Sequence, residues 1–77
     1  MTYYDFMVRN IEVLTYLNAN GYDDADFYRM GVYEKFLEMR RSGMSVKATL
    51  LTMEQQGYGS MATVKRIRRR MEQAIAE

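Results

Sequence analysis

Hydrophobic side chains recur at spacings of three and four residues along most of the chain, the repeat of one face of an α-helix. Glycines beside polar residues interrupt the repeat, proline is absent, and good helix formers dominate the periodic stretches. The pattern therefore predicts an all-α chain of four helices, or of five if Gly31 divides the second. The expected helices run from Thr2 to Asn20, from Asp23 to Ser42, from Ser45 to Gly57, and from Ser60 to about Ile75.

Residues suited to helix capping stand at each expected start. Thr2 has an acidic residue three positions later, close to the spacing of a capping box. Ser45 and Ser60 can each accept a hydrogen bond from a first-turn N–H group. Asp23 and Asp24 complement the positive end of the second helix.

The last helix divides most clearly into two faces. Val64, Ile67, Met71 and Ile75 form one apolar stripe, and the opposite side is basic and polar. Five of the six residues from Lys65 to Arg70 are basic, and no acidic residue occurs from position 61 to position 71. A solvated helical face usually mixes acids among its bases, so this run favours an anionic partner.

Composition narrows the class of protein. The chain has 77 residues and contains neither Cys nor His, so disulfides and zinc sites of the usual kinds are excluded. Its apolar runs are too short for a membrane span, and its start lacks the features of an export signal. We expect a single cytoplasmic domain over residues 1–77 that is not an enzyme and takes no cofactor, metal or small-molecule substrate.

Charge is distributed unevenly along the chain. Residues 1–38 carry three basic and seven acidic side chains, whereas residues 39–77 carry eight basic and three acidic ones. The overall charge of +1 thus conceals a balance of −4 followed by +5. A positive field at one end raises the encounter rate with an anionic partner.

The second half of the chain resembles a known class of DNA-binding domain. The run from Ser45 to Leu51, followed by the run from Gly57 to Arg66, is similar to the helix-turn-helix of homeodomain-like transposase, resolvase and small phage or plasmid regulator domains. Those domains often begin their recognition helix with Ser-x-x-Thr-Val-x-Arg. The matching residues here are Ser60, Thr63, Val64 and Arg66.

The resemblance implies a fold and four residue roles. It implies a helix-turn-helix on a three-helix core within residues 24–77, with the recognition helix at about residues 60–75. Ser60 would cap that helix and touch a phosphate, and Thr63 would contact a base or a phosphate. Val64 would lie in the core, and Arg66 would contact DNA. The turn from Gly57 to Ser60 is longer than the tight version of the motif.

Further DNA contacts are expected around the basic helix. Its outward side chains extend the candidate site, and the start of the preceding helix adds two more. Tyr58 in the turn can either donate to a phosphate or cover the core. The added DNA-contacting candidates are Ala62, Lys65, Arg69, Arg70, Lys47, Thr49 and Tyr58.

Arg68 lies nearest the apolar stripe and is the exception within the basic run. We expect it to pair inside the protein with Glu34, Glu38 or Glu54.

The first helix, within residues 1–21, has a wide apolar face with two open interpretations. It can cover the core formed by the other helices, or part of it can form a two-fold dimer. A dimer would present two recognition helices about one DNA turn apart and require a palindromic site. The candidate dimer residues are Tyr3, Tyr4, Met7, Ile11 and Leu14.

Together these features predict a sequence-specific protein that binds double-stranded DNA. We expect a transcriptional regulator or a DNA-binding module of a phage, plasmid or other mobile element. The alternative is a small phage-type inhibitor or adaptor that binds a host protein. RNA binding is less favoured, because no aromatic residues alternate with the basic ones.

Overall fold

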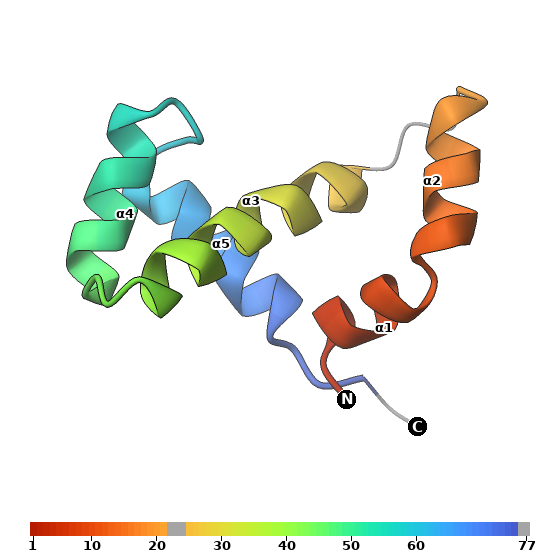
Figure 1. The fold of residues 1–77 in the computed structure, drawn as a ribbon, viewed down its shortest axis with the longest axis horizontal. Helices are drawn as coiled ribbons and strands as arrows, with labels where there is room; N and C mark the ends of the chain where they lie inside the picture. The colour runs from red at the N-terminus through yellow and green to blue at the C-terminus, as the bar shows by residue number, and fades with distance from the viewer. Residues whose placement is uncertain (22–24, 76–77) are drawn as a thin grey trace.

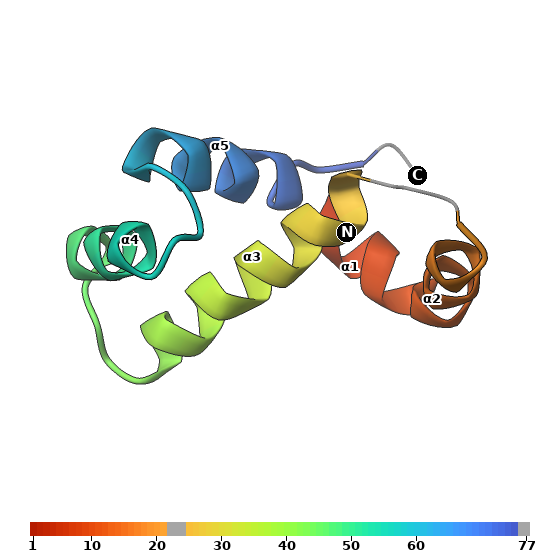
Figure 2. The ribbon, with the colours of Figure 1, turned by 90° about the horizontal axis from the view of Figure 1, so that it is seen from above.

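The computed structural model describes residues 1–21 and 25–75, and within these ranges the chain is helical, with no strand. The five described helices are α1 (Tyr3–Arg9), α2 (Ile11–Ala19), α3 (Ala25–Arg41), α4 (Val46–Gln55) and α5 (Met61–Met71). Helices α3, α4 and α5 pack against one another, and α2 lies at the opposite end of the molecule from α4 (Figure 1, Figure 2). The prediction of an all-α chain is confirmed.

The hydrophobic core lies mainly between α3, α4 and α5. Leu50 and Met53 of α4 and Val64 and Met71 of α5 are the largest hydrophobic side chains that are fully buried. α3 contributes several more buried side chains, and Met7 is the buried residue that α1 adds. α2 buries none of its residues. The core is therefore assembled almost entirely by the last three helices.

The N-terminal helix expected from Thr2 to Asn20 is broken at Asn10. The backbone of Asn10 (φ −109°, ψ 21°) leaves the helical region, and α2 starts at the next residue. The Asn10 side chain donates from Nδ2 to the Phe6 carbonyl at 2.8 Å. Asparagine competes for backbone groups in this way, which makes it a poor interior helix residue. Gly31, the break considered from the sequence, lies inside an uninterrupted α3.

The last helix is also shorter than expected, because α5 ends at Met71 rather than near Ile75. The chain then runs beside its own N-terminus. Tyr3 N donates to the Gln73 carbonyl at 2.8 Å, and Ile75 N donates to the Met1 carbonyl at 3.2 Å. These two hydrogen bonds between the N-terminal and C-terminal segments take the place of further helical turns. Ile75 therefore does not extend the apolar stripe of α5.

The capping residues largely behave as the sequence predicts. Thr2 forms a capping box with Asp5, and the hydroxyls of Ser45 and Ser60 accept hydrogen bonds from first-turn N–H groups of α4 and α5. The expected caps Asp23 and Asp24 lie outside the described residues.

Candidate nucleic-acid interface

Helix α5 has one buried face and one exposed cationic face. Val64, Ile67 and Met71 are only 1%, 7% and 0% exposed. The other side of the helix is open, with Ala62, Lys65, Arg66 and Arg69 all exposed. Because the apolar residues are spaced three and four apart, packing them into the core necessarily turns the basic residues outward. This basic face carries three cationic side chains: Lys65, Arg66 and Arg69.

Helices α4 and α5 meet at a steep corner. In Figure 2 α4 is seen nearly end-on, whereas α5 lies across the view. The turn between them includes Gly57 (φ 86°) and Gly59 (φ 127°), in backbone regions that L-residues rarely adopt. A Cβ atom on Gly59 would lie 3.2 Å from Cγ2 of Thr63, a tight contact that the Thr63 side chain would have to relieve by a small shift.

The N-terminus of α5 is capped from two sides. Ser60 Oγ accepts a hydrogen bond from Thr63 N at 3.2 Å and lies 3.0 Å from Thr63 Oγ1. Glu54 Oε2 of α4 accepts from Met61 N at 3.1 Å. Sequence reasoning did not foresee that Glu54, an expected partner of Arg68, caps this helix. The two caps fix the start of α5 relative to α4.

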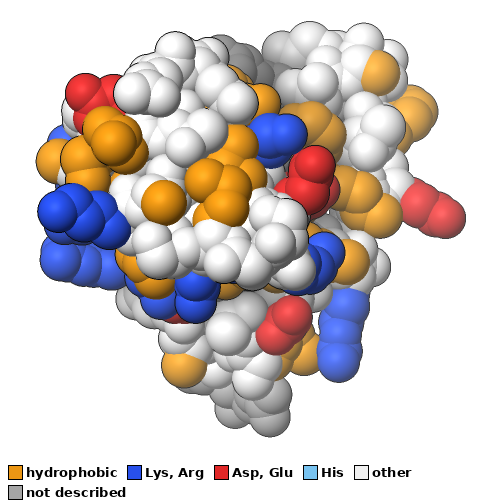
Figure 3. Space-filling model, turned by 60° about the vertical axis from the view of Figure 1, so that its left-hand side comes forward, with side chains coloured by type: hydrophobic (Ala, Val, Ile, Leu, Met, Phe, Trp, Pro, Cys, Tyr) orange, Lys and Arg blue, Asp and Glu red, His pale blue; other side chains and the backbone are white. Residues whose placement is uncertain are grey.

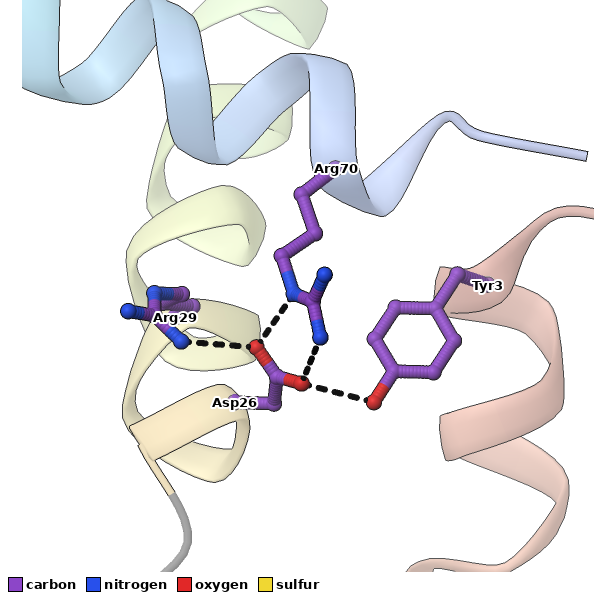
Figure 4. Close-up of polar contacts among 4 residues, drawn as sticks. All are labelled: Tyr3, Asp26, Arg29 and Arg70. Carbon is purple, nitrogen blue, oxygen red and sulfur yellow. Dashed lines mark hydrogen bonds and ion pairs between the residues drawn. The ribbon is translucent and has the colours of Figure 1, made fainter.

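Arg70, like Arg68, is engaged within the protein. Its Nε and Nη2 atoms donate to the two carboxylate oxygens of Asp26, both at 2.6 Å. Arg29 donates to the same carboxylate at 2.9 Å, and the Tyr3 hydroxyl donates at 2.8 Å (Figure 4). The Arg70 guanidinium also lies 5.1 Å from the centre of the Tyr3 ring. Arg70 thus connects α5 to α3 and α1 through Asp26 and Tyr3, and the expected contact of its half-exposed side chain with DNA stays a prediction.

The charges around Asp26 perturb one another strongly. The hydrogen bond from Arg70 is the main reason that the pKa of Asp26 lies well below its usual 3.8, and burial opposes this effect. The same hydrogen bond raises the pKa of Arg70 above its usual value. The Asp26 side chain is only 10% exposed, so it needs these partners to remain charged.

Arg68 pairs inside the protein, as expected, but not with the expected acids. Its Nε donates to Glu72 Oε2 at 3.1 Å, and its guanidinium lies 5.1 Å from the centre of the Phe36 ring. Glu72 is four residues further along, where a side chain of the last helical turn can reach it. Tyr33 also donates to Glu72, at 3.0 Å. Burial and this carboxylate raise the pKa of Tyr33 to about 12.

The candidates outside α5 divide into exposed and buried residues. Lys47 is exposed at the start of α4, and Tyr58 is half-buried against the core. Thr49 is 0% exposed, and its hydroxyl donates to the Ser45 carbonyl at 2.8 Å. The expectation that Thr49 contacts a phosphate is thus wrong, because its short side chain faces the core and bonds back to its own helix.

A groove of about 550 Å³ runs beside the basic face of α5. It brings Thr63 and Arg66 together with two residues of α3 that the sequence did not single out, Tyr28 and Arg29. Tyr28 is 63% exposed. The two helices are far apart in the sequence, so no local pattern could have identified these neighbours. The lining residues are Ala25, Tyr28, Arg29, Thr63, Arg66, Ile67 and Arg70.

The basic side chains on one face of the molecule are spread out rather than gathered in one place. On the face shown in Figure 3, Lys and Arg side chains lie at several separate places, with hydrophobic, uncharged and a few acidic side chains between them. An extended anion with charges at intervals fits such a surface better than a single compact anion does.

The residues expected at a dimer interface do not share one exposed surface. Met7 is 2% exposed and belongs to the core, so its assignment to an interface is corrected. Tyr3, Tyr4 and Leu14 are half-buried against the same core, whereas Ile11 is exposed. The full or partial burial of Met7, Tyr3, Tyr4 and Leu14 agrees with the other interpretation of this segment, that it covers the core.

Neither a metal site nor a membrane span is found within the described residues. No three His, Cys, Asp or Glu side chains there lie together as metal ligands. No helix within those ranges has both the length and the hydrophobicity needed to cross a membrane.

Compared with known protein families, curated proteins and solved structures, the chain matches none of them. The resemblance to helix-turn-helix domains therefore stays a prediction from the sequence.

Proposed function

We propose that this protein binds double-stranded DNA sequence-specifically, with α4 and α5 as a helix-turn-helix and α3 packed behind them. The observation that carries the proposal is the division of α5 into a buried face and the exposed basic face of Lys65, Arg66 and Arg69. A recognition helix must be held from one side and free on the other to enter the major groove.

The residues have distinct roles in this proposal. Arg66 lies beside Thr63 in the groove next to α5, and we assign these two to base edges, where an arginine can bind a guanine with two hydrogen bonds. Lys65 and Arg69 contact phosphates. The small exposed side chain of Ala62 permits close approach to the DNA.

Contacts at the two helix starts would fix the orientation on the duplex. We assign Lys47, at the exposed start of α4, and Ser60, in the turn, to phosphates. Tyr58 flanks this turn and packs against the core. A transcriptional regulator or a DNA-binding module of a phage, plasmid or other mobile element is the role we propose.

Selection of bound duplexes from a random pool, followed by affinity measurements, tests the proposal. Arg66→Ala should lose about 1–3 kcal/mol on the selected duplex and less on a scrambled one. Arg69→Ala should weaken binding equally on both duplexes and lower the slope of log affinity against log salt by about one.

Lys35→Ala is the matched control, because it removes one positive charge from α3, where Lys35 already lies 3.5 Å from Glu38. It should leave affinity and salt slope nearly unchanged. Failure of the wild-type protein to bind any duplex at physiological salt would overturn the proposal and favour the inhibitor or adaptor that binds a host protein. Equal effects of Lys35→Ala and Arg66→Ala would show that only overall charge matters.

A further inference from the structure

Helix α2 is apolar but buries none of its residues. Of its nine residues, Glu12 alone is charged, and Val13, Tyr16 and Leu17 are 58%, 68% and 37% exposed. These three are spaced three and four positions apart, so they lie on one side of the helix. Exposed apolar side chains continue into α1. We call the whole set the α1–α2 apolar surface, and its residues are Phe6, Val8, Ile11, Val13, Tyr16 and Leu17. The set extends around both helices, because residues two positions apart point to opposite sides, and its centre is the side of α2 that carries Val13, Tyr16 and Leu17.

The core does not need these side chains. The buried hydrophobic cluster is built from α3, α4 and α5 with Met7 of α1. From α2 only the half-buried Leu14 packs against this cluster, and α2 lies at the opposite end of the molecule from α4 (Figure 1). An exposed group of large apolar residues in a small protein usually marks a contact surface. Small domains of this size also gain much of their stability from association.

We infer that the α1–α2 apolar surface binds a second copy of this chain, related by a two-fold axis. In a two-fold interface the same patch lies on both partners, so a patch with a large net charge would repel itself. Within residues 6–17 the charges are those of Arg9 and Glu12, which cancel. The surface is therefore suited to contact its own copy.

The size of the surface fits a small dimer interface rather than a standard one. A standard interface buries about 800 Å² on each partner, and roughly 65% of a homodimer interface is apolar, which requires on the order of 500 Å² of apolar area. An aromatic side chain alone can bury about 150–250 Å². With exposed fractions of 37–68%, the six side chains offer about that area in total, and Val13, Tyr16 and Leu17 on one side of α2 supply the part that a single contact covers directly.

The first experiment measures the mass of the full chain, without DNA, by sedimentation equilibrium over a range of concentrations. The wild-type protein should reach twice the monomer mass, and Val13→Glu combined with Tyr16→Glu should remain monomeric. Leu51→Glu is the matched control, because Leu51 is similarly exposed (47%) on α4, and it should still dimerise. Circular dichroism of each variant establishes that it is folded.

The second experiment uses the absence of cysteine from the chain. A single Tyr16→Cys substitution should form disulfide-linked dimers on mild oxidation, at a rate at least tenfold above that of Leu51→Cys.

A wild-type monomer at every concentration, or a dimer that the double glutamate variant does not dissociate, would overturn the inference. So would a monomer that instead co-sediments with lipid vesicles. Since neither experiment contains DNA, their failure would leave the proposed DNA binding untouched.

Discussion

Asp26 is the residue at which three helices of the molecule are joined. It lies at the start of α3, and its carboxylate accepts hydrogen bonds from Arg70 of α5 and Tyr3 of α1 as well as from Arg29. A carboxylate that is 10% exposed is costly to bury unless its oxygens are paired, and here both oxygens are paired with guanidinium groups. The cluster of Asp26, Arg70, Arg29 and Tyr3 therefore holds α1, α3 and α5 together and differs from an exposed surface ion pair.

Replacing Asp26 with Asn should destabilise the protein at neutral pH. Loss of the carboxylate leaves Arg70 and Arg29 without their anion, but both remain partly exposed to water, so we expect a cost of about 2 kcal/mol. Urea denaturation of the wild-type protein and the variant at pH 7 gives the difference. Glu38→Gln is the control, because Glu38 is 70% exposed and its loss should change the free energy of unfolding little.

The stability that Asp26 contributes should also depend on pH. Its pKa is lower in the folded protein than the ordinary 3.8, so the folded state binds fewer protons than the unfolded state near that pH. The contribution is therefore complete above about pH 5 and is lost as the pH falls below the ordinary pKa. The difference between wild-type and Asp26→Asn free energies should be smaller at pH 3 than at pH 7. If this difference is the same at both pH values, another group is responsible for the loss of stability at low pH.

The role of Arg70 illustrates what local sequence cannot predict. Within the run from Lys65 to Arg70 the sequence separates a core residue, Ile67, from basic ones, and the burial of Ile67 agrees with this. Arg70 has the same chemistry as Arg69, yet its partner Asp26 is 44 residues away. Helical periodicity gives the direction of a side chain on its own helix. Which distant group meets it depends on how the helices pack.

At the scale of elements, two glycines should respond to substitution in opposite ways. Gly31 lies inside α3 with nothing within 4 Å of the position a Cβ atom would take, so Gly31→Ala should stabilise the protein by about 1 kcal/mol. Gly59 in the turn before α5 has φ 127°, which L-residues rarely adopt, and a Cβ atom there would contact Thr63 tightly. Gly59→Ala should destabilise it by about 1–3 kcal/mol.

Thermal unfolding followed by circular dichroism measures both effects on the same protein. The two variants add the same methyl group, so each serves as the control for the other. Equal and small effects at the two sites would mean that the turn between α4 and α5 is not held in the conformation described.

The sequence predicts the elements well where a single side chain determines the boundary. The hydroxyls of Thr2, Ser45 and Ser60 mark the starts of α1, α4 and α5, because each bonds within its own first turn. The break at Asn10 and the end of α5 at Met71 were missed. The break at Asn10 is hidden because the apolar repeat continues through that residue. The end of α5 is hidden because the residues after it form hydrogen bonds with the distant N-terminus, and local periodicity carries no information about such long-range bonds.

At the scale of the whole molecule, the proposed DNA contacts and the α1–α2 apolar surface belong to different parts of the fold. α4 and α2 lie at opposite ends, with α3 and α5 between them (Figure 2). Dimerisation through α2 would therefore leave the basic face of α5 open in both copies. A two-fold dimer of this kind should select DNA sites with inverted half-sites, whereas a monomer should select a single half-site.

The same arrangement predicts an uneven pattern of amide hydrogen exchange. In dilute protein the amides of α2 should exchange fastest among the helices, because α2 fully buries no side chain and only its half-buried Leu14 packs against the core. The amides of α4, which contains the fully buried Leu50 and Met53, should exchange slowest together with those of α5. Raising the protein concentration should protect α2 by a larger factor than α4, since a second copy covers α2 directly and stabilises the rest only through association. The variant with Val13→Glu and Tyr16→Glu should lose this concentration dependence while keeping slow exchange in α4. If α2 of the wild-type protein stays equally unprotected at all concentrations, its apolar side chains are open to solvent and the two copies, if they meet, do so elsewhere.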